Sequence, residues 1–346
     1  MKSKFFALFI ACALILNAAG AASAQTKSTK TSNQLLALLP ASDGVAALDA
    51  KRFFNVALPQ LLSGNKPMLD EINGQIDDFK AKTSIDIRQF EQIAVGFTGK
   101  QVSENVTQFE PIVLARGNFS ASSIVTLAKF ASNGTYKEEK IGGRTVYIFS
   151  AKEIVEKNKP AGKSSLIQKI LDKILPSLSG ETAITVYDNN TLAFGKLERL
   201  RLMLTDGKSR VDANLLAQAN RSPNAVASFA ANLPKGFSSF MNLENDELGK
   251  NLDSIRQVYG MMDVVGENTQ VSFTAKTLET AQAEGLQQTM TDLRELGRIF
   301  LGSSKGDDKK VYVRMLESLK ITRVASEVTF DLQVPQTDIN VLIGAK

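Results

Sequence analysis

Two short motifs in the chain contain the residue types of known phosphate-binding or catalytic sequences. The first, Gly162-Lys163-Ser164, has the glycine, lysine and hydroxyl that end a phosphate-binding loop. That loop also needs an earlier glycine, directly after a strand, at the position that Lys157 occupies. The segment therefore cannot wrap a phosphate in the usual way, and a plain helix start is the simpler interpretation.

The second motif pairs a serine with a lysine. The segment 63–66, Ser-Gly-Asn-Lys, has the spacing of a serine nucleophile activated by lysine. Tyr187-Asp188-Asn189 is similar to a further motif of penicillin-recognising enzymes, but their third element, Lys-Thr-Gly, is missing. Hydrolysis by Ser63 and Lys66 is thus one alternative to be tested.

Adjacent carboxylates provide a third candidate chemistry. Asp77-Asp78, Glu138-Glu139 and Asp307-Asp308 are residue types that support glycoside hydrolysis or bind calcium. None of these pairs has the alternating oxygen ligands and central glycine of a calcium loop. We interpret them as solvated surface, with a carboxylate hydrolase as the alternative.

Two absences exclude whole classes of chemistry. The sequence contains no histidine, and its one cysteine, Cys12, lies in the N-terminal apolar run. The chain therefore lacks serine–histidine triads, cysteine–histidine dyads and the usual ligands of zinc, iron and copper. We expect no catalytic residues of these kinds, no metal site and no cofactor.

A few residues are candidates for a contact surface instead. Lysines gather on a predicted loop and on the amphipathic helix after it, where they could dock an anionic lipid or polymer. Aromatic and basic residues also gather on a predicted hairpin. The candidate contact residues are Lys157, Lys159 and Lys163 in the first group, and Tyr136, Arg144 and Tyr147 in the second.

The N-terminus has the pattern of a secretory signal. Lys2 and Lys4 precede an apolar run over 5–16, and Ala22-Ser23-Ala24 is a small-x-small cleavage site. The apolar run is shorter than the ~20 residues that a membrane span needs. The pattern therefore predicts a signal peptide over 1–24.

The residues after the signal indicate an exported protein. A polar, basic stretch over 25–33 predicts a flexible arm, and no later segment is long and apolar enough to cross a bilayer. A lipoprotein signal that uses Cys12 is the alternative, but the apolar run continues past that residue. We expect a periplasmic or extracellular protein without a membrane span after cleavage.

Charge argues against nucleic acid as a partner. Removing Lys2 and Lys4 with the signal lowers the net charge from +5 to +3. No dense basic patch with interleaved aromatic residues is present, and the chain contains no tryptophan.

Hydrophobic periodicity predicts an α+β fold, with antiparallel sheets covered by helices in two similar halves. A unit of strand, turn, strand and helix over 90–130 is followed much later by the same order over 256–300. This internal repeat predicts a first half over 34–210 and a second half over 211–346.

Several short segments resemble a group of exported bacterial proteins of unknown function. They are LLP before GVAALD (38–49), IAVGF (93–97), VLARGNF (113–119), the hairpin from Tyr136 to Tyr147, and TLAFGK (191–196). The resemblance implies an exported protein of α+β class and implies no catalytic residues.

These observations favour one function over another. The chain is predicted to be an exported, non-catalytic binding or interaction module of the bacterial cell envelope. Its partner would be an envelope protein, lipid or polymer. The alternative is an envelope hydrolase that needs neither histidine nor cysteine and uses carboxylates or a Ser/Lys pair.

Overall fold

The computed structural model describes residues 34–103, 106–132, 134–150, 181–205, 210–234, 247–303 and 306–344. The predicted signal peptide and N-terminal arm lie outside these residues. The described residues divide into two compact units. Unit 1 contains residues 34–55 and 67–216, and unit 2 contains residues 56–66 and 217–344. The predicted division of the chain into halves over 34–210 and 211–346 remains a prediction.

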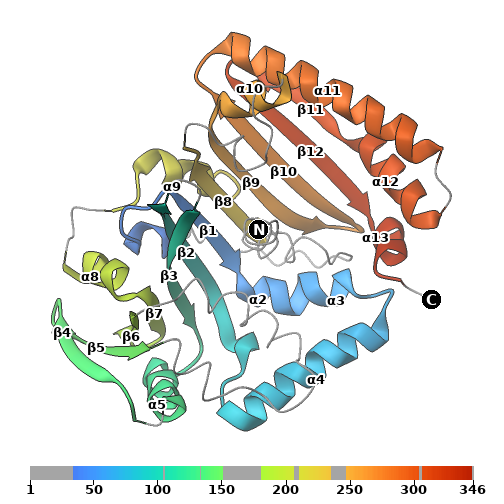
Figure 1. The fold of residues 1–346 in the computed structure, drawn as a ribbon. Coiled ribbons are helices and arrows are strands. Elements are labelled where there is room, and N and C mark those ends of the chain that lie inside the picture. The colour runs from blue at the N-terminus through green and yellow to red at the C-terminus, as the bar shows by residue number, and fades with distance from the viewer. Residues whose placement is uncertain are drawn as a thin grey trace. The chain divides into compact units, whose positions relative to one another are not determined.

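Unit 1 is a sheet with helices before, between and after its strands (Figure 1). Its strands are β1 (Gly44–Asp49), β2 (Phe90–Ser103), β3 (Val106–Gly117), β4 (Lys137–Ile141), β5 (Arg144–Ser150), β6 (Glu181–Asp188) and β7 (Thr191–Lys196). Its helices are η1 (Leu36–Leu38), α2 (Ala50–Arg52), η3 (Ile87–Gln89), α5 (Ala121–Ala131) and α8 (Leu197–Thr205). The elements η2 (Phe53–Ala57), α4 (Lys66–Thr83) and α9 (Ala213–Ala219) each include a point of division between the units.

The strands of unit 1 lie in the order β1-β2-β3-β7-β6-β5-β4, and all neighbours are antiparallel. Helix α5 begins after Ser120, whose side chain accepts a hydrogen bond from the backbone of Ser123, as a helix cap does. Its apolar face packs on the sheet. The shared core consists of Ala121, Val125, Phe149, Ile184 and Leu192, with Tyr136 and Tyr147 packed against it.

Unit 2 repeats this combination of sheet and helices with fewer strands. Its strands are β8 (Ala227–Asn232), β9 (Ile255–Val265), β10 (Asn268–Thr277), β11 (Lys320–Val324) and β12 (Glu327–Pro335). Its helices are α3 (Leu58–Leu61), α10 (Glu247–Asp253), α11 (Thr280–Gly302), α12 (Asp307–Ser318) and α13 (Gln336–Leu342). The strands lie in the order β8-β9-β10-β12-β11, again antiparallel. Both units are therefore α+β, as the sequence predicts; internal duplication stays a prediction.

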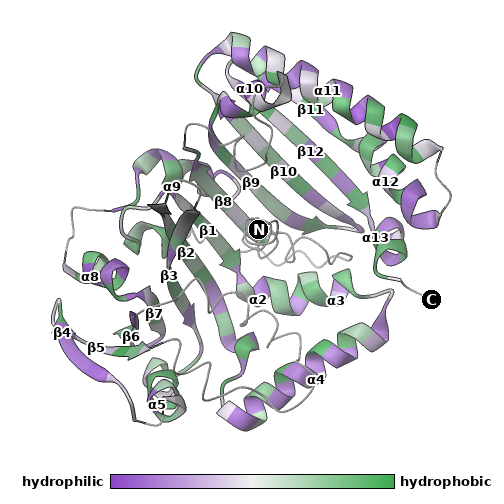
Figure 2. Ribbon diagram, in the orientation of Figure 1, coloured by the Kyte–Doolittle hydropathy of each residue, from purple (hydrophilic) through white to green (hydrophobic). Residues whose placement is uncertain are grey.

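One face of the unit 2 sheet is aromatic and is covered by a helix. Phe229, Gly260, Phe273 and Phe330 lie directly opposite one another across β8, β9, β10 and β12. The Phe229 and Phe273 ring centroids are 6.2 Å apart, and those of Phe273 and Phe330 are 5.9 Å apart. We call these four residues the aromatic row. Helix α11, which shows alternating polar and apolar bands in Figure 2, packs Ala283 and Leu286 against this face.

Two predicted loops are wrong in part. The polar residues of 99–108 predict a turn over that whole segment, but β2 continues to Ser103 and β3 begins at Val106. The charged residues of 302–310 predict a loop, but α12 begins within this segment at Asp307. Antiparallel pairing of β2 with β3 in the first case, and packing of the buried Val311 in the second, override the local polarity.

The buried face of β2 also differs from the prediction. The alternation of Ile93, Val95 and Phe97 with smaller or polar residues predicts that these three side chains form the buried face of the strand, yet they are only half-buried. Ala94 is fully buried instead, and a side chain added to Gly96 would lie 2.7 Å from the Ser42 hydroxyl. The small residues of β2 thus face the segment that follows η1. This segment can approach the sheet closely because the side chains beneath it are small.

No helix within the described ranges is both long enough and apolar enough to cross a membrane.

The aromatic row generates a prediction about stability. A methyl group added at Gly260 would lie 2.4 Å from the Ser272 carbonyl oxygen and 2.8 Å from the Phe229 ring. We expect Gly260→Ala to lower the free energy of unfolding by about 1–3 kcal/mol, because the backbone and ring would have to move apart. Urea denaturation followed by circular dichroism would measure the change.

Gly74→Ala in α4 is the matched control for this substitution. An added methyl there meets nothing within 4 Å, so the helix should gain roughly 0.5–1 kcal/mol. If Gly260→Ala were as stable as the original protein while Gly74→Ala behaved as expected, the row would not constrain the fold.

Candidate functional site

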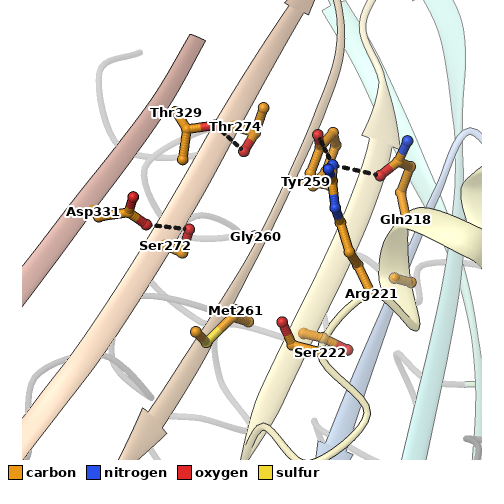
Figure 3. Close-up of a pocket in the computed structure, with 12 residues that line it drawn as sticks. Gln218, Arg221, Ser222, Tyr259, Gly260, Met261, Ser272, Thr274, Thr329 and Asp331 are labelled. Carbon is orange, nitrogen blue, oxygen red and sulfur yellow. Dashed lines mark hydrogen bonds between the residues drawn. The ribbon is translucent and has the colours of Figure 1, made fainter. Parts of the chain in front are cut away.

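A hollow bordered by described residues lies on the other face of the unit 2 sheet. Its volume is about 270 Å³. Most of the lining residues are polar and contribute hydroxyls, one guanidinium and one carboxylate. The lining residues are Gln218, Ala219, Arg221, Ser222, Ser228, Tyr259, Gly260, Met261, Ser272, Thr274, Thr329 and Asp331 (Figure 3). We call it the unit 2 hollow.

Strand alternation places these side chains on one face. Because successive residues of a strand point to opposite faces, Tyr259 and Met261 on β9 point away from the side on which the aromatic row lies. The register then aligns Tyr259 with Thr274, and Thr274 with Thr329, across β9, β10 and β12. It likewise aligns Met261 with Ser272, and Ser272 with Asp331. The floor of the hollow is therefore two rows of cross-strand neighbours.

Hydrogen bonds hold the floor in place. The Ser272 hydroxyl donates to an Asp331 carboxylate oxygen at 2.7 Å, and the hydroxyls of Thr274 and Thr329 lie 2.9 Å apart. Figure 3 shows both pairs spanning β10 and β12. The second Asp331 oxygen has no partner among the described residues, and the residue is exposed, so it can accept a hydrogen bond from a ligand.

Arg221 and Tyr259 form one wall. The Arg221 guanidinium donates to the Tyr259 hydroxyl and lies 3.5 Å from a Glu327 carboxylate oxygen. Lys276 lies 3.5 Å from the other oxygen of Glu327, so this carboxylate is shared by two cations. The Nε and Nη2 groups of Arg221 have no partner among the described residues, and the side chain is 58% exposed. They are free to donate to a ligand.

Tyr259 is held in its neutral form. Its side chain lies almost fully inside the sheet, with 4% of the residue exposed. Burial, together with the Glu327 carboxylate, raises the pKa of Tyr259 above its ordinary value. The phenol therefore stays protonated at neutral pH and offers a hydroxyl to its neighbours, not a base or a nucleophile.

Hydrogen-bonding groups line the unit 2 hollow. Within the part of the chain that the structure describes, Asp331 is the one carboxylate in this lining, whereas general acid–base hydrolysis needs two converging groups. Among the described residues no cluster of three His, Cys, Asp or Glu side chains could hold a metal ion. What the hollow presents is a donor at Arg221, an acceptor at Asp331 and hydroxyls between them.

The motifs that suggest catalysis are not assembled into a site in the described structure. Ser63 and Lys66 are both exposed, and the Ser63 hydroxyl accepts a hydrogen bond from Gln336 at 3.0 Å. The Tyr187 ring is covered by the Arg144 guanidinium, 4.4 Å from its centroid. The Gly162-Lys163-Ser164 motif lies outside the described residues.

Most of the adjacent carboxylates are paired with basic side chains. Asp77 pairs with Arg88, and Asp307 pairs with Lys310 at 2.9 Å. The neighbours Glu138 and Glu139 bind different cations: Glu138 pairs with Lys129 at 3.1 Å and Glu139 with Arg201 at 2.7 Å. These contacts fit the interpretation of these residues as solvated surface.

The predicted contact residues are only partly described. Lys157, Lys159 and Lys163 lie outside the described residues. Tyr136 and Tyr147 come together, with ring centroids 6.1 Å apart and ring planes at 70°. Arg144 is engaged elsewhere, because its Nε donates to the Tyr187 carbonyl oxygen at 3.0 Å. Whether these residues contact a partner stays a prediction.

The residues of the unit 2 hollow were not identified from the sequence. The alternation in 270–276 does place Ser272 and Thr274 opposite Val271, Phe273 and Ala275. The missing information is the register, since that brings Asp331 beside Ser272. The residues around Arg221 do not indicate a binding site, because they have the composition of a turn between two halves of the chain.

Comparison with known proteins adds little to this geometry. No family model matches the chain, and no curated protein matches it. Among solved structures, crystal form III of TP0453 is similar at 8% identity with a TM-score of 0.42, covering 90% of this chain and 98% of that one. Crystal form IV gives 8% and 0.43, covering 89% and 95%. Crystal form I gives 9% and 0.40, also covering 89% and 95%.

The raised pKa of Tyr259 can be tested by titration. A tyrosine whose pKa is higher in the folded state than in the unfolded state stabilises the fold below pH ~10, and this contribution is lost as the pH rises through the folded pKa. Tyr259→Phe removes one phenol from the protein. We expect the phenolate absorbance that this variant lacks to appear, in the original protein, at a pH above the ordinary titration range of tyrosine. Loss of a component that titrates at or below pH ~10 would contradict the burial of this phenol.

Proposed function

We propose that the chain is an exported, non-catalytic binding protein of the bacterial cell envelope, and that the unit 2 hollow contacts its ligand. The predicted signal peptide over 1–24 supports export. Arg221 and Asp331 carry opposite charges, and each keeps hydrogen-bonding atoms without a partner among the described residues, which supports binding. The ligand class that fits best is a neutral, hydroxyl-rich polymer, that is, a glycan chain.

The charge of the unit 2 hollow supports a neutral ligand. Arg221 and Asp331 are the charged residues of its lining, and their charges cancel. An anion would be repelled by Asp331, and a cation by Arg221. Sugar hydroxyls both donate and accept hydrogen bonds, so they can satisfy a guanidinium and a carboxylate at once.

The shape of the unit 2 hollow supports a chain that extends beyond it. Its volume of about 270 Å³ is slightly below the ~300–1,000 Å³ of typical small-molecule pockets. One sugar ring would fill it, while neighbouring rings of a polymer would lie along the sheet. Met261 adds apolar surface between the polar groups, against which the carbon face of a sugar ring can pack.

The observation on which the proposal depends most is the spare hydrogen-bonding capacity of Arg221 and Asp331. Most other carboxylates discussed above have a basic partner, so they would lose a contact on meeting a ligand. Arg221 and Asp331 are already oriented by Tyr259 and Ser272, respectively, yet each keeps polar groups open to a ligand. Such preorganisation lowers the entropic cost of binding.

Substitution of either group should weaken binding. We expect Arg221→Gln and Asp331→Asn each to raise the dissociation constant for an insoluble, uncharged glycan such as chitin about tenfold or more. Loss of a charge-assisted hydrogen bond costs about 1.5–3 kcal/mol, and ~1.4 kcal/mol corresponds to tenfold. Co-sedimentation of the folded protein with this glycan would measure the change.

Arg201→Gln and Asp77→Asn are the matched controls, because they make the same chemical changes in exposed ion pairs of unit 1. Both should bind as the original protein does. Equal binding by all four variants would reject the unit 2 hollow as the site. Release of soluble sugar fragments in proportion to added protein would instead support the hydrolase alternative.

A further inference from the structure

A lysine ammonium lies between two tyrosine rings in unit 1. The Nζ atom of Lys129 is 3.9 Å from the centroid of Tyr147 and 5.0 Å from that of Tyr136. The carboxylate of Glu138 completes the surroundings, with an oxygen 3.1 Å from the same nitrogen. We call Tyr136, Tyr147 and Glu138 the cage.

The walls of the cage are fixed by the fold. Tyr147 on β5 lies directly opposite Glu138 on β4, so both side chains share one face of the sheet. Tyr136 comes just before β4 and packs on the Phe149 ring at 5.9 Å. Both tyrosines pack against the core beneath α5. The two rings thus keep their near-perpendicular arrangement without help from Lys129.

The occupant is less constrained than the walls. Lys129 lies in the last turn of α5 and reaches the cage through a flexible four-carbon chain. The Lys129 side chain is 28% exposed and that of Glu138 is 49% exposed, so the cage opens to solvent. Although burial opposes it, Glu138 and the tyrosines raise the pKa of Lys129, which keeps the ammonium charged.

Two aromatic faces beside a carboxylate are a known arrangement for binding methylated ammonium groups. A quaternary ammonium is attracted to ring faces and, unlike lysine, has no N–H groups that must lose water. It can therefore replace the lysine ammonium at a smaller cost in desolvation. A bound Lys129 would compete as a tethered ligand, at an effective concentration of order mM.

We propose that the cage binds the quaternary ammonium group of an external ligand, and that Lys129 is a resident occupant which the ligand displaces. This site is independent of the unit 2 hollow. It uses two of the residues singled out on the hairpin, Tyr136 and Tyr147. The third, Arg144, contributes nothing to it, because its guanidinium covers the single ring of Tyr187.

The test removes the occupant and measures binding of a simple probe. The full chain without its signal is titrated with tetramethylammonium, and binding is followed by tyrosine fluorescence, which no tryptophan obscures in this protein. The original protein should bind weakly. Lys129→Ala should bind about tenfold more tightly or better, because the competing ammonium is gone.

Further variants locate the probe in the cage. In the Lys129→Ala background, Tyr147→Leu should weaken binding about 2- to 30-fold, as expected for loss of one cation–π contact. Glu138→Gln should also weaken it, and this exposed residue can be changed without disturbing the core. Circular dichroism checks that each variant is folded, so Glu138→Gln remains informative if Tyr147→Leu does not fold.

Arg144→Ala is the matched control, since it removes a cation from a single tyrosine ring and should gain no binding. A neutral probe of the same shape, in which a carbon atom replaces the charged nitrogen, should not bind to Lys129→Ala. The proposal is overturned if Lys129→Ala binds tetramethylammonium no better than the original protein. It is equally overturned if Arg144→Ala gains as much, or if the neutral probe binds as well.

Discussion

The absence of a side chain at Gly260 is the constraint on which the unit 2 sheet depends. Phe229 and Phe273 meet over this residue, and a methyl group there would collide with both the ring and the backbone. Close contact of the rings lets α11 cover one face of the sheet with an apolar surface. Because strand residues alternate, the neighbours Tyr259 and Met261 must then face the other side. The polar hollow is thus a geometric consequence of the aromatic packing behind it.

The same coupling between a packed face and an exposed one recurs in unit 1. The core beneath α5 holds the rings of Tyr136 and Tyr147, while Glu138 and Lys129 extend from its edge towards solvent. In both units apolar packing fixes aromatic side chains, and partly exposed charged groups complete the surroundings. The aromatic side chains make the surroundings rigid. In the two proposed sites, the charged groups would decide which ligands are preferred.

Charge pairing decides which polar residues remain available. Most of the adjacent acidic residues that suggested hydrolysis have a basic partner close by. Exposed pairs of this kind contribute little to stability. Arg221 differs because its guanidinium is oriented by Tyr259 yet keeps free donors. With no histidine in the chain, proton transfer near neutral pH would have to rely on carboxylates, and the unit 2 hollow presents one, Asp331. These open donor and acceptor groups are the basis on which we propose a binding site.

The sequence by itself determined the α+β class and most of the helices and strands, because hydrophobic spacing and caps such as Ser120 act between near neighbours in the chain. It also excluded histidine chemistry from composition alone. Only the tertiary structure decided which face of β2 is buried and that Asp307 begins a helix. It alone placed Asp331 beside Ser272, and Arg221 beside Tyr259. Those outcomes depend on strand register and on packing between distant segments, and neither is encoded in the spacing of adjacent residues.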